Sequence, residues 1–337
     1  MRYNIRDTDD SQLTVAVEAR WNSLTKPPGS LGQLEKLVLQ LALAQGTERP
    51  KVARRTMVLF CGDHGVTEEG VSAFPKAVTG QMVANFLRGG AAINVLCKQA
   101  RMEKLIVDCG VDGVPVAGTV DRWLGRGTAN FVKGPAMSGG QVDRALENGA
   151  ALAQSLDCDV AAVGEMGIGN TTAASALLCA YCGVGAEEAV GAGTGLDEAG
   201  MRRKADVVGR GLARHAGVTE AMGILGAFAG FEMATMAGFF LGAAERGMPV
   251  VVDGFIASAA ALAARAIDPR VMPYLVFSHV SAERPHRRLL AELGVRPLLD
   301  LDLRLGEGSG AALAIPILEA AVALYEGMAT FGEAGVG

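Results

Sequence analysis

Short apolar runs recur along the chain, each leading into a glycine, an acid or a serine and then into a helical pattern. Such runs are typical of strands that are buried on both faces of a sheet. Strands that alternate with helices form parallel sheets, because each crossover helix returns the chain to the same end of the sheet. The sequence therefore predicts an α/β fold with a mainly parallel, Rossmann-like sheet and helices on both faces. The expected strands are residues 56–60, 105–107, 160–163, 249–252, 274–277 and 297–301.

The two ends of the chain have a purely helical pattern. Apolar residues recur at helical spacing over residues 10–43, and residues 311–325 form another apolar helical stretch. We expect both ends to pack together as a small helical domain beside the sheet. The predicted division is a large α/β substrate-binding domain, residues 50–310, and a small helical domain, residues 1–49 with 311–337.

A long apolar stretch, residues 221–244, carries a single charge, Glu232. Its length suits a membrane span, but a carboxylate in the middle and many small residues argue against one. Glycines four residues apart allow two helices to approach closely. We therefore expect a buried helix and no membrane span. The glycines concerned are Gly226, Gly230, Gly238 and Gly242.

The composition fits a compact enzyme. Half of the 337 residues (50%) are hydrophobic, which excludes a disordered chain, and the 45 glycines lack the three-residue period of collagen. A net charge of −5 without a basic block argues against a nucleic-acid partner. The six scattered cysteines are typical of reduced, mostly buried thiols in a cytoplasmic protein. Cys179 and Cys182 form one CxxC pair without a second pair, so no zinc site and no cofactor is expected.

The sharpest local motif lies between an expected strand and an expected helix, at residues 164–172. Its glycines let the backbone approach a ligand, and Asn-Thr-Thr suits the start of a helix. Free N–H groups there predict a site for a phosphate or another anion. A glycine-rich turn with an ordinary helix cap is the alternative, but Glu165 inside the turn favours a ligand site. The loop residues concerned are Gly167, Ile168, Gly169, Asn170 and Thr171.

A second glycine-containing segment, residues 193–197, precedes an expected helix over residues 198–215. This helix carries Arg202, Arg203 and Lys204. A cation beside a phosphate loop would neutralise the charge of the ligand. For any one of these three residues, a basic helix face in solvent is the simpler explanation.

Glu307 lies between two glycines, at the end of an expected strand and ahead of an apolar helix. A partly desolvated carboxylate has a raised pKa and suits a general base. A helix-capping acid is the alternative. Asp63-His64 and Ser278-His279 lack the spacing of metal ligands, and the sequence contains no GxSxG elbow of a serine hydrolase. We expect these two pairs to form hydrogen bonds within the loops that shape the cleft.

Taken in order, these motifs resemble those of the nicotinate-nucleotide–dimethylbenzimidazole phosphoribosyltransferases, enzymes of cobalamin lower-ligand assembly. The resemblance extends over nearly the whole chain. Each motif alone is moderately specific, and their order makes the combination highly specific. The matching segments are residues 26–32, 61–66, 165–172, 193–197, 253–256, 278–279 and 304–310.

The resemblance implies a homodimer and a defined reaction. The phosphoribosyl group of nicotinate mononucleotide passes to 5,6-dimethylbenzimidazole with inversion at the sugar carbon, giving α-ribazole 5′-phosphate and nicotinate. By resemblance, Glu307 is the general base, while Glu165 and Lys204 lie around the ribose phosphate. The backbone of residues 167–171 would complete the phosphate site. The aromatic base would be bordered by Phe74, Gln81, Met82 and Leu305.

Two positions depart from the family pattern. Arg284-Pro285 stands where Pro-Gly is expected, and Phe74 stands where some members have a small polar residue. Pockets lined by Phe and Met accept several aromatic rings, so the preferred base stays open among dimethylbenzimidazole, adenine and phenolic compounds.

Two other functions remain as alternatives. A non-catalytic regulator that binds nucleotides through the same phosphate loop is one. A nicotinamide-dependent oxidoreductase is another, but it would need a GxGxxG fingerprint with an acid about 20 residues further on. No segment of this sequence fits that fingerprint well.

Overall fold

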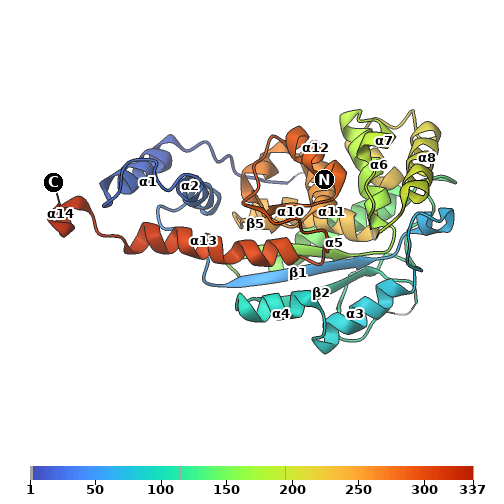
Figure 1. Ribbon diagram of the computed structural model, residues 1–337, viewed down its shortest axis with the longest axis horizontal. Coiled ribbons are helices and arrows are strands. Elements are labelled where there is room, and N and C mark those ends of the chain that lie inside the picture. Colours follow the sequence, from blue (N-terminus) through green and yellow to red (C-terminus); the bar gives the residue numbers. More distant parts are fainter. Residues whose placement is uncertain (1–2, 114, 194, 337) are drawn as a thin grey trace.

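A parallel six-stranded sheet forms the centre of the computed structural model, which describes residues 3–113, 115–193 and 195–336 (Figure 1). Its strand order is β3-β2-β1-β4-β5-β6, and every neighbouring pair is parallel. The predicted parallel α/β fold is therefore confirmed. The strands are β1 (Arg55–Gly62), β2 (Glu103–Gly110), β3 (Val120–Asp121), β4 (Val160–Met166), β5 (Val250–Val252) and β6 (Leu275–Phe277).

The last expected strand lies outside this sheet. Residues 297–301 contain β8 (Leu299–Asp300), which pairs with β7 (His279–Val280) in a separate two-stranded parallel sheet. Leu299 is only partly buried, whereas the strands at the centre of the main sheet are buried almost throughout. An apolar run alone does not tell which sheet a strand joins, because that depends on contacts distant in sequence.

Helices cover both faces of the sheet, as predicted. Alternate residues of β1 enter two separate hydrophobic cores, because successive side chains of a strand point to opposite faces. Val58 and Phe60 pack in the core formed with α5, α6, α10 and α11, and Met57 and Leu59 pack in the core formed with α2, α3, α4 and α13. The helices of the molecule are α1 (Ser11–Ser23), α2 (Gln33–Gln45), α3 (Val78–Arg88), α4 (Ala92–Gln99), α5 (Gly139–Ser155), α6 (Asn170–Cys182), α7 (Ala186–Ala189), α8 (Glu198–Arg214), α9 (Ala221–Phe228), α10 (Phe231–Glu245), α11 (Phe255–Ile267), α12 (Arg284–Leu293), α13 (Ser309–Gly327) and α14 (Phe331–Ala334), with 3₁₀ turns η1 (Gly65–Glu69) and η2 (Pro269–Tyr274).

The N-terminal helices α1 and α2 and the C-terminal helix α14 gather at the far end of α13, whereas residues 3–6 lie against α10 and η2 (Figure 1). The rings of Trp21 and Tyr325 lie 5.0 Å apart, and Leu24 forms an isolated β-bridge with Thr330. The first half of α13 instead packs against the sheet and α4. The division into residues 50–310 and residues 1–49 with 311–337 stays a prediction.

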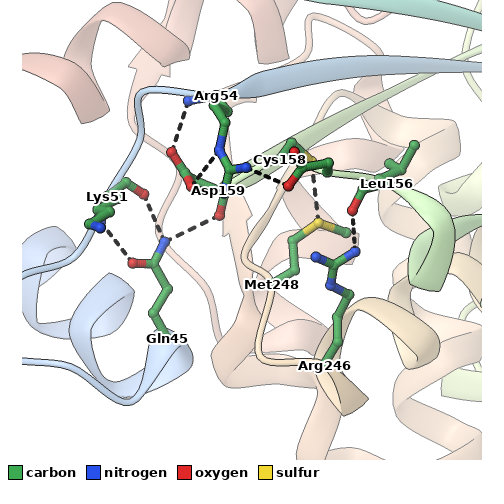
Figure 2. Close-up of polar contacts among 9 residues, drawn as sticks. Gln45, Lys51, Arg54, Leu156, Cys158, Asp159, Arg246 and Met248 are labelled. Atoms are coloured by element: carbon green, nitrogen blue, oxygen red, sulfur yellow. Dashed lines mark hydrogen bonds and ion pairs between the residues drawn. The ribbon is translucent and has the colours of Figure 1, made fainter.

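A polar network joins α2 to the amino ends of β1 and β4 (Figure 2). The Gln45 side chain donates to the carbonyl oxygens of Lys51, at 2.7 Å, and Asp159, at 3.2 Å. Arg54 donates to both carboxylate oxygens of Asp159 through its backbone N–H and its guanidinium, at 2.8 and 3.0 Å. These bonds hold the N-terminal helices at the end of the sheet opposite to the strand ends that carry the glycine motifs.

The apolar stretch 221–244 is buried, as predicted, but forms two helices, α9 and α10, that meet at Ala229-Gly230. Gly238 and Gly242 of α10 face α5, whose Gly149 faces back. A Cβ at Gly238 would lie 2.2 Å from the Leu146 carbonyl oxygen. Among the described residues, α13 is the one helix that is long and apolar enough to cross a membrane, and it packs against α2 and α4.

We predict that Gly238→Ala lowers the thermal stability of the protein. The added methyl group meets backbone, which cannot move aside as a side chain can, and overpacking of this kind costs about 1–3 kcal/mol. Gly209→Ala is the matched control, because Gly209 is also helical but has open space around its Cβ position. The control is expected to be neutral or slightly stabilising. The measurement is the melting temperature of each variant and of the unmodified protein. A melting temperature of Gly238→Ala equal to that of Gly209→Ala would contradict the close contact between α5 and α10.

Candidate active site

A cavity of about 290 Å³ lies at the carboxyl ends of the central strands, where parallel sheets bind their ligands. Four segments that are distant in sequence line it, and this confirms that the glycine-rich strand ends converge. They are residues 165–171 after β4, residues 253–257 after β5, residues 279–283 and residues 304–307 before α13.

The loop between β4 and α6 forms one wall. Gly169 precedes α6 with φ +96°, a left-handed conformation that suits glycine. The N–H of Ile168 donates to Thr79 Oγ1 at 3.0 Å, and the N–H of Asn170 donates to the Gly167 carbonyl. Among the described residues, the loop N–H groups without a partner are that of Gly167 and, at the start of the helix, those of Gly169 and Thr171. These two N–H groups, at the start of a helix, are suited to bind an anion.

Lys204 of α8 stands beside this loop. It is 1% exposed, and its ammonium donates to Thr171 Oγ1 at 2.7 Å and to the Gly191 carbonyl at 3.4 Å. Burial lowers the pKa of Lys204 to about 8, although nearby Glu283 opposes this change. Arg202 is by contrast exposed and Arg203 lies at the surface, so the solvated-face explanation holds for them and not for Lys204. Thr194, in the segment that precedes α8, lies outside the described residues.

Glu165 is buried at the end of β4, and its carboxylate accepts a short hydrogen bond from Asn170 Nδ2. Burial, followed by the negative charges of Asp253 and Glu232, raises the pKa of Glu165 to about 8. The side chain is therefore largely protonated at neutral pH when the cavity holds no cation.

Glu307 occupies the turn before α13 with φ +60°, an uncommon conformation for a residue with a side chain. It is 7% exposed, and its Oε2 is buried without a hydrogen-bond partner among the described residues. Burial, and secondly the charge of Asp253, raises the pKa of Glu307. An acid with a raised pKa and an unused oxygen in a cavity is suited to accept a proton.

Asp253 holds the turn that carries Glu307. Its two carboxylate oxygens accept from the N–H groups of Gly308, at 3.1 Å, and Ala311, at 3.0 Å. Asp253 thus caps α13, so the alternative of Glu307 as the capping acid does not hold. The sequence motifs do not predict this capping role of Asp253, although an acid followed by glycine directly after a strand is a signal of a site residue.

The two acid–histidine and serine–histidine motifs form hydrogen bonds around the cleft, as predicted. His64 lies 2.6 Å from Glu232 through its Nε2, beneath Gly167. His279 lines the cavity, and its Nδ1 lies 3.1 Å from Ser278 Oγ. Among the described residues, no group of three or more acids, histidines or cysteines is arranged to hold a metal ion.

The residues predicted around an aromatic base are only partly brought together. Phe74 and Leu305 line the mouth of the cavity, where they are 51% and 56% exposed. Gln81 and Met82 lie on α3 outside the lining, Gln81 in solvent and Met82 against the second core. Helical spacing alone could not show which way these two side chains point.

A family model described as phosphoribosyltransferase matches residues 7–336. Two enzymes named nicotinate-nucleotide–dimethylbenzimidazole phosphoribosyltransferase are similar over nearly full length: the Ralstonia nicotianae enzyme is 49% identical (97% of this chain, 94% of the relative), and the Azotobacter vinelandii enzyme is 51% identical (98% and 96%). The chain belongs to this phosphoribosyltransferase family. It is thus an enzyme rather than a non-catalytic nucleotide-binding regulator.

The solved structures of the family have the same fold. The crystal structure of CobT from Thermus thermophilus aligns with a TM-score of 0.93 at 45% identity, over 97% of this chain and 99% of that one. A second structure of the phosphoribosyltransferase from Thermus thermophilus aligns with a TM-score of 0.92 at 44% identity, over the same shares of both chains. The resemblance inferred from the motifs is therefore confirmed.

For this phosphoribosyltransferase we predict that Glu165→Gln stabilises the ligand-free protein, and more so at higher pH. The folded protein holds the Glu165 proton up to about pH 8, whereas the unfolded chain releases it near the ordinary value of 4.5. Stability therefore falls as the pH rises between these two values, and glutamine removes this loss. Melting curves at pH 5 and pH 8 measure it. Glu18→Gln, a change at an exposed glutamate, is the control. A stability difference between Glu165→Gln and the unmodified protein that does not change with pH would contradict the raised pKa of Glu165.

Proposed function

We propose that the protein transfers the phosphoribosyl group of nicotinate mononucleotide to 5,6-dimethylbenzimidazole, forming α-ribazole 5′-phosphate and nicotinate in cobalamin nucleotide-loop assembly. The family and the printed names of its full-length relatives support these substrates. The observation that carries the proposal is the buried, unpaired Oε2 of Glu307 in the same cavity as the phosphate-type loop.

The phosphate of the mononucleotide binds at the start of α6 in this proposal. The N–H groups of Gly169 and Thr171, the Thr171 hydroxyl and the Lys204 ammonium supply the donors. A phosphate there favours the charged form of the lysine further, because an anion opposes the effect of burial on the pKa. Binding energy from this end of the substrate then orients the sugar.

Departure of nicotinate needs little assistance from the protein. The ring leaves from a cationic pyridinium, so it departs with the electron pair of the breaking C1′–N bond and without a positive charge on its nitrogen. The sugar carbon gains positive charge at the same time. A carboxylate at Glu165 stabilises this charge, and the substrate cation itself favours ionisation of Glu165.

The incoming base attacks C1′ from the side opposite to the leaving ring, which inverts the sugar carbon from β to α. One benzimidazole nitrogen forms the new C1′–N bond, and the other nitrogen gives its proton to Glu307. The raised pKa of Glu307 suits this transfer, because a general base works best when its pKa lies nearer the working pH. Phe74 and Leu305, at the cavity mouth, are the apolar surfaces for the aromatic base, with Gln81 and Met82 further out on α3.

We also propose that the enzyme is a homodimer in the cytoplasm. Phe74 and Leu305 are large apolar side chains exposed at the cavity mouth, and contact with a second copy of the chain would cover them. Light scattering tests this by measuring the mass of the protein in solution. All six cysteines are free thiols, which suits a reducing compartment.

Glu307→Gln is expected to reduce turnover by about 100-fold or more, the usual contribution of a general base, with little change in folding. The assay incubates the protein with nicotinate mononucleotide and dimethylbenzimidazole and measures released nicotinate. The kcat of the unmodified enzyme should fall as the pH is lowered, because protonated Glu307 accepts no proton. Since the pKa of Glu307 is raised, this fall should begin at a higher pH than for an ordinary glutamate.

Glu326→Gln, an exposed acid near the far end of α13, is the matched control and should retain full turnover. Turnover of Glu307→Gln within about twofold of the unmodified enzyme would overturn the role of Glu307. Failure of the unmodified enzyme to release nicotinate would overturn the proposed reaction.

A further inference from the structure

Thr79, near the start of α3, binds the backbone of the anion loop from outside. Its side chain is fully buried, and Oγ1 accepts the Ile168 N–H at 3.0 Å across 89 residues of sequence. Ile168 is the central residue of Gly167-Ile168-Gly169. A loop with glycine on both sides has little conformational preference of its own, so an external hydrogen bond has a large influence on its shape.

The position of Ile168 determines where the neighbouring N–H groups point. Gly169 is the next residue and Thr171 lies three positions further along than Ile168, and the N–H groups of both have no partner among the described residues. A rotation of the peptide before Ile168 would displace the Gly169 N–H. Thr79 is thus placed to set the direction of the anion donors without touching the ligand, since it is absent from the cavity lining.

Thr79 is itself held by the residues after β1. The Ile168 bond uses the oxygen of the hydroxyl and leaves its hydrogen free. The hydroxyl lies near the buried Asp63 carboxylate, where it opposes the rise that burial causes in the pKa of Asp63. Asp63 Oδ1 has no hydrogen-bond partner among the described residues. The Oδ2 of Asp63 accepts the Asp112 N–H at 2.8 Å. His64, the next residue, packs against Gly167 from below, so the segment after β1 supports the loop at two points.

We propose that Thr79 is a positioning residue of this enzyme, connecting Asp63 to the Ile168 N–H so that the loop presents the Gly169 and Thr171 N–H groups to the substrate phosphate. This inference rests on the proposed function in one respect, the identity of the phosphate-bearing substrate. It explains why the Asp63-His64 motif lies under the cavity without lining it.

The test replaces Thr79 by valine and by serine. Valine keeps the shape and removes the hydroxyl, which leaves the Ile168 N–H buried without an acceptor, whereas serine keeps the hydroxyl. Calorimetric titration with nicotinate mononucleotide should show about tenfold weaker binding for Thr79→Val, within the range expected for loss of one buried hydrogen bond. Thr79→Ser should bind within about threefold of the unmodified protein. The loss in kcat/KM for the mononucleotide should follow the same order, mainly through KM.

Thr235→Val is the matched control, because Thr235 is also fully buried and helical but donates within its own helix to Phe231. It should bind like the unmodified protein. Equal binding by Thr79→Val and the unmodified protein would overturn the proposal, as would equal impairment of the valine and serine variants, since packing of the methyl group would then explain the effect. If the unmodified protein binds nicotinate mononucleotide but releases no nicotinate, the proposed reaction is refuted. The binding affinities of the Thr79 variants would still decide whether Thr79 positions the loop.

Discussion

Three carboxyl groups, Glu165, Asp253 and Glu307, are buried together in one cavity, and much of the site architecture follows from this constraint. Like charges in a low-dielectric space raise one another's pKa, so each group needs donors or must hold a proton. Asp253 is given two backbone N–H groups of α13, and Glu165 is given the Asn170 amide. Glu307 receives no donor for its Oε2 among the described residues. Of these three groups, Glu307 is the one with an oxygen left free to exchange a proton with a ligand. Glu283, which also lines the cavity, has a buried Oε2 without a partner among the described residues as well.

The scaffold brings these acids together through parallel topology. Glu165 is the penultimate residue of β4 and Asp253 follows β5, which are adjacent strands of the same sheet, while the turn before α13 places Glu307 beside them. Close packing holds this arrangement from behind. A Cβ at Gly164 would lie 2.4 Å from the Gly308 nitrogen, so the strand and the Glu307 turn approach each other nearly backbone to backbone. The position of Glu307 therefore depends on a small residue one step before Glu165.

Most of the fold could be predicted from the sequence, because buried strands and glycine-rich strand ends are local patterns. The anion loop and Glu307 were found in the same way. Local pattern alone does not separate Lys204 from Arg202, because tertiary packing decides which side of α8 is buried; the family resemblance is what singles out Lys204 in the sequence. The role of Asp253 depends on N–H groups 55 and 58 residues away. The separate pairing of β8 with β7 depends on similarly distant contacts, which no local pattern contains.

Lys204 and the free N–H groups lie at the start of α6, with Glu283 near the lysine. The other three acids of the cavity lie toward Asp253 and the α13 turn. Nicotinate mononucleotide carries an anionic phosphate at one end and the positive pyridinium nitrogen of its carboxylate-bearing ring at the other, so the orientation with the phosphate at α6 brings that nitrogen toward the three acids. In the proposed reaction the cation is consumed. Its loss leaves the departing ring without the attraction that oriented it, while the retained phosphate keeps the sugar in place for the incoming base. The same buried acids that destabilise the empty cavity thus favour binding before transfer and release after it.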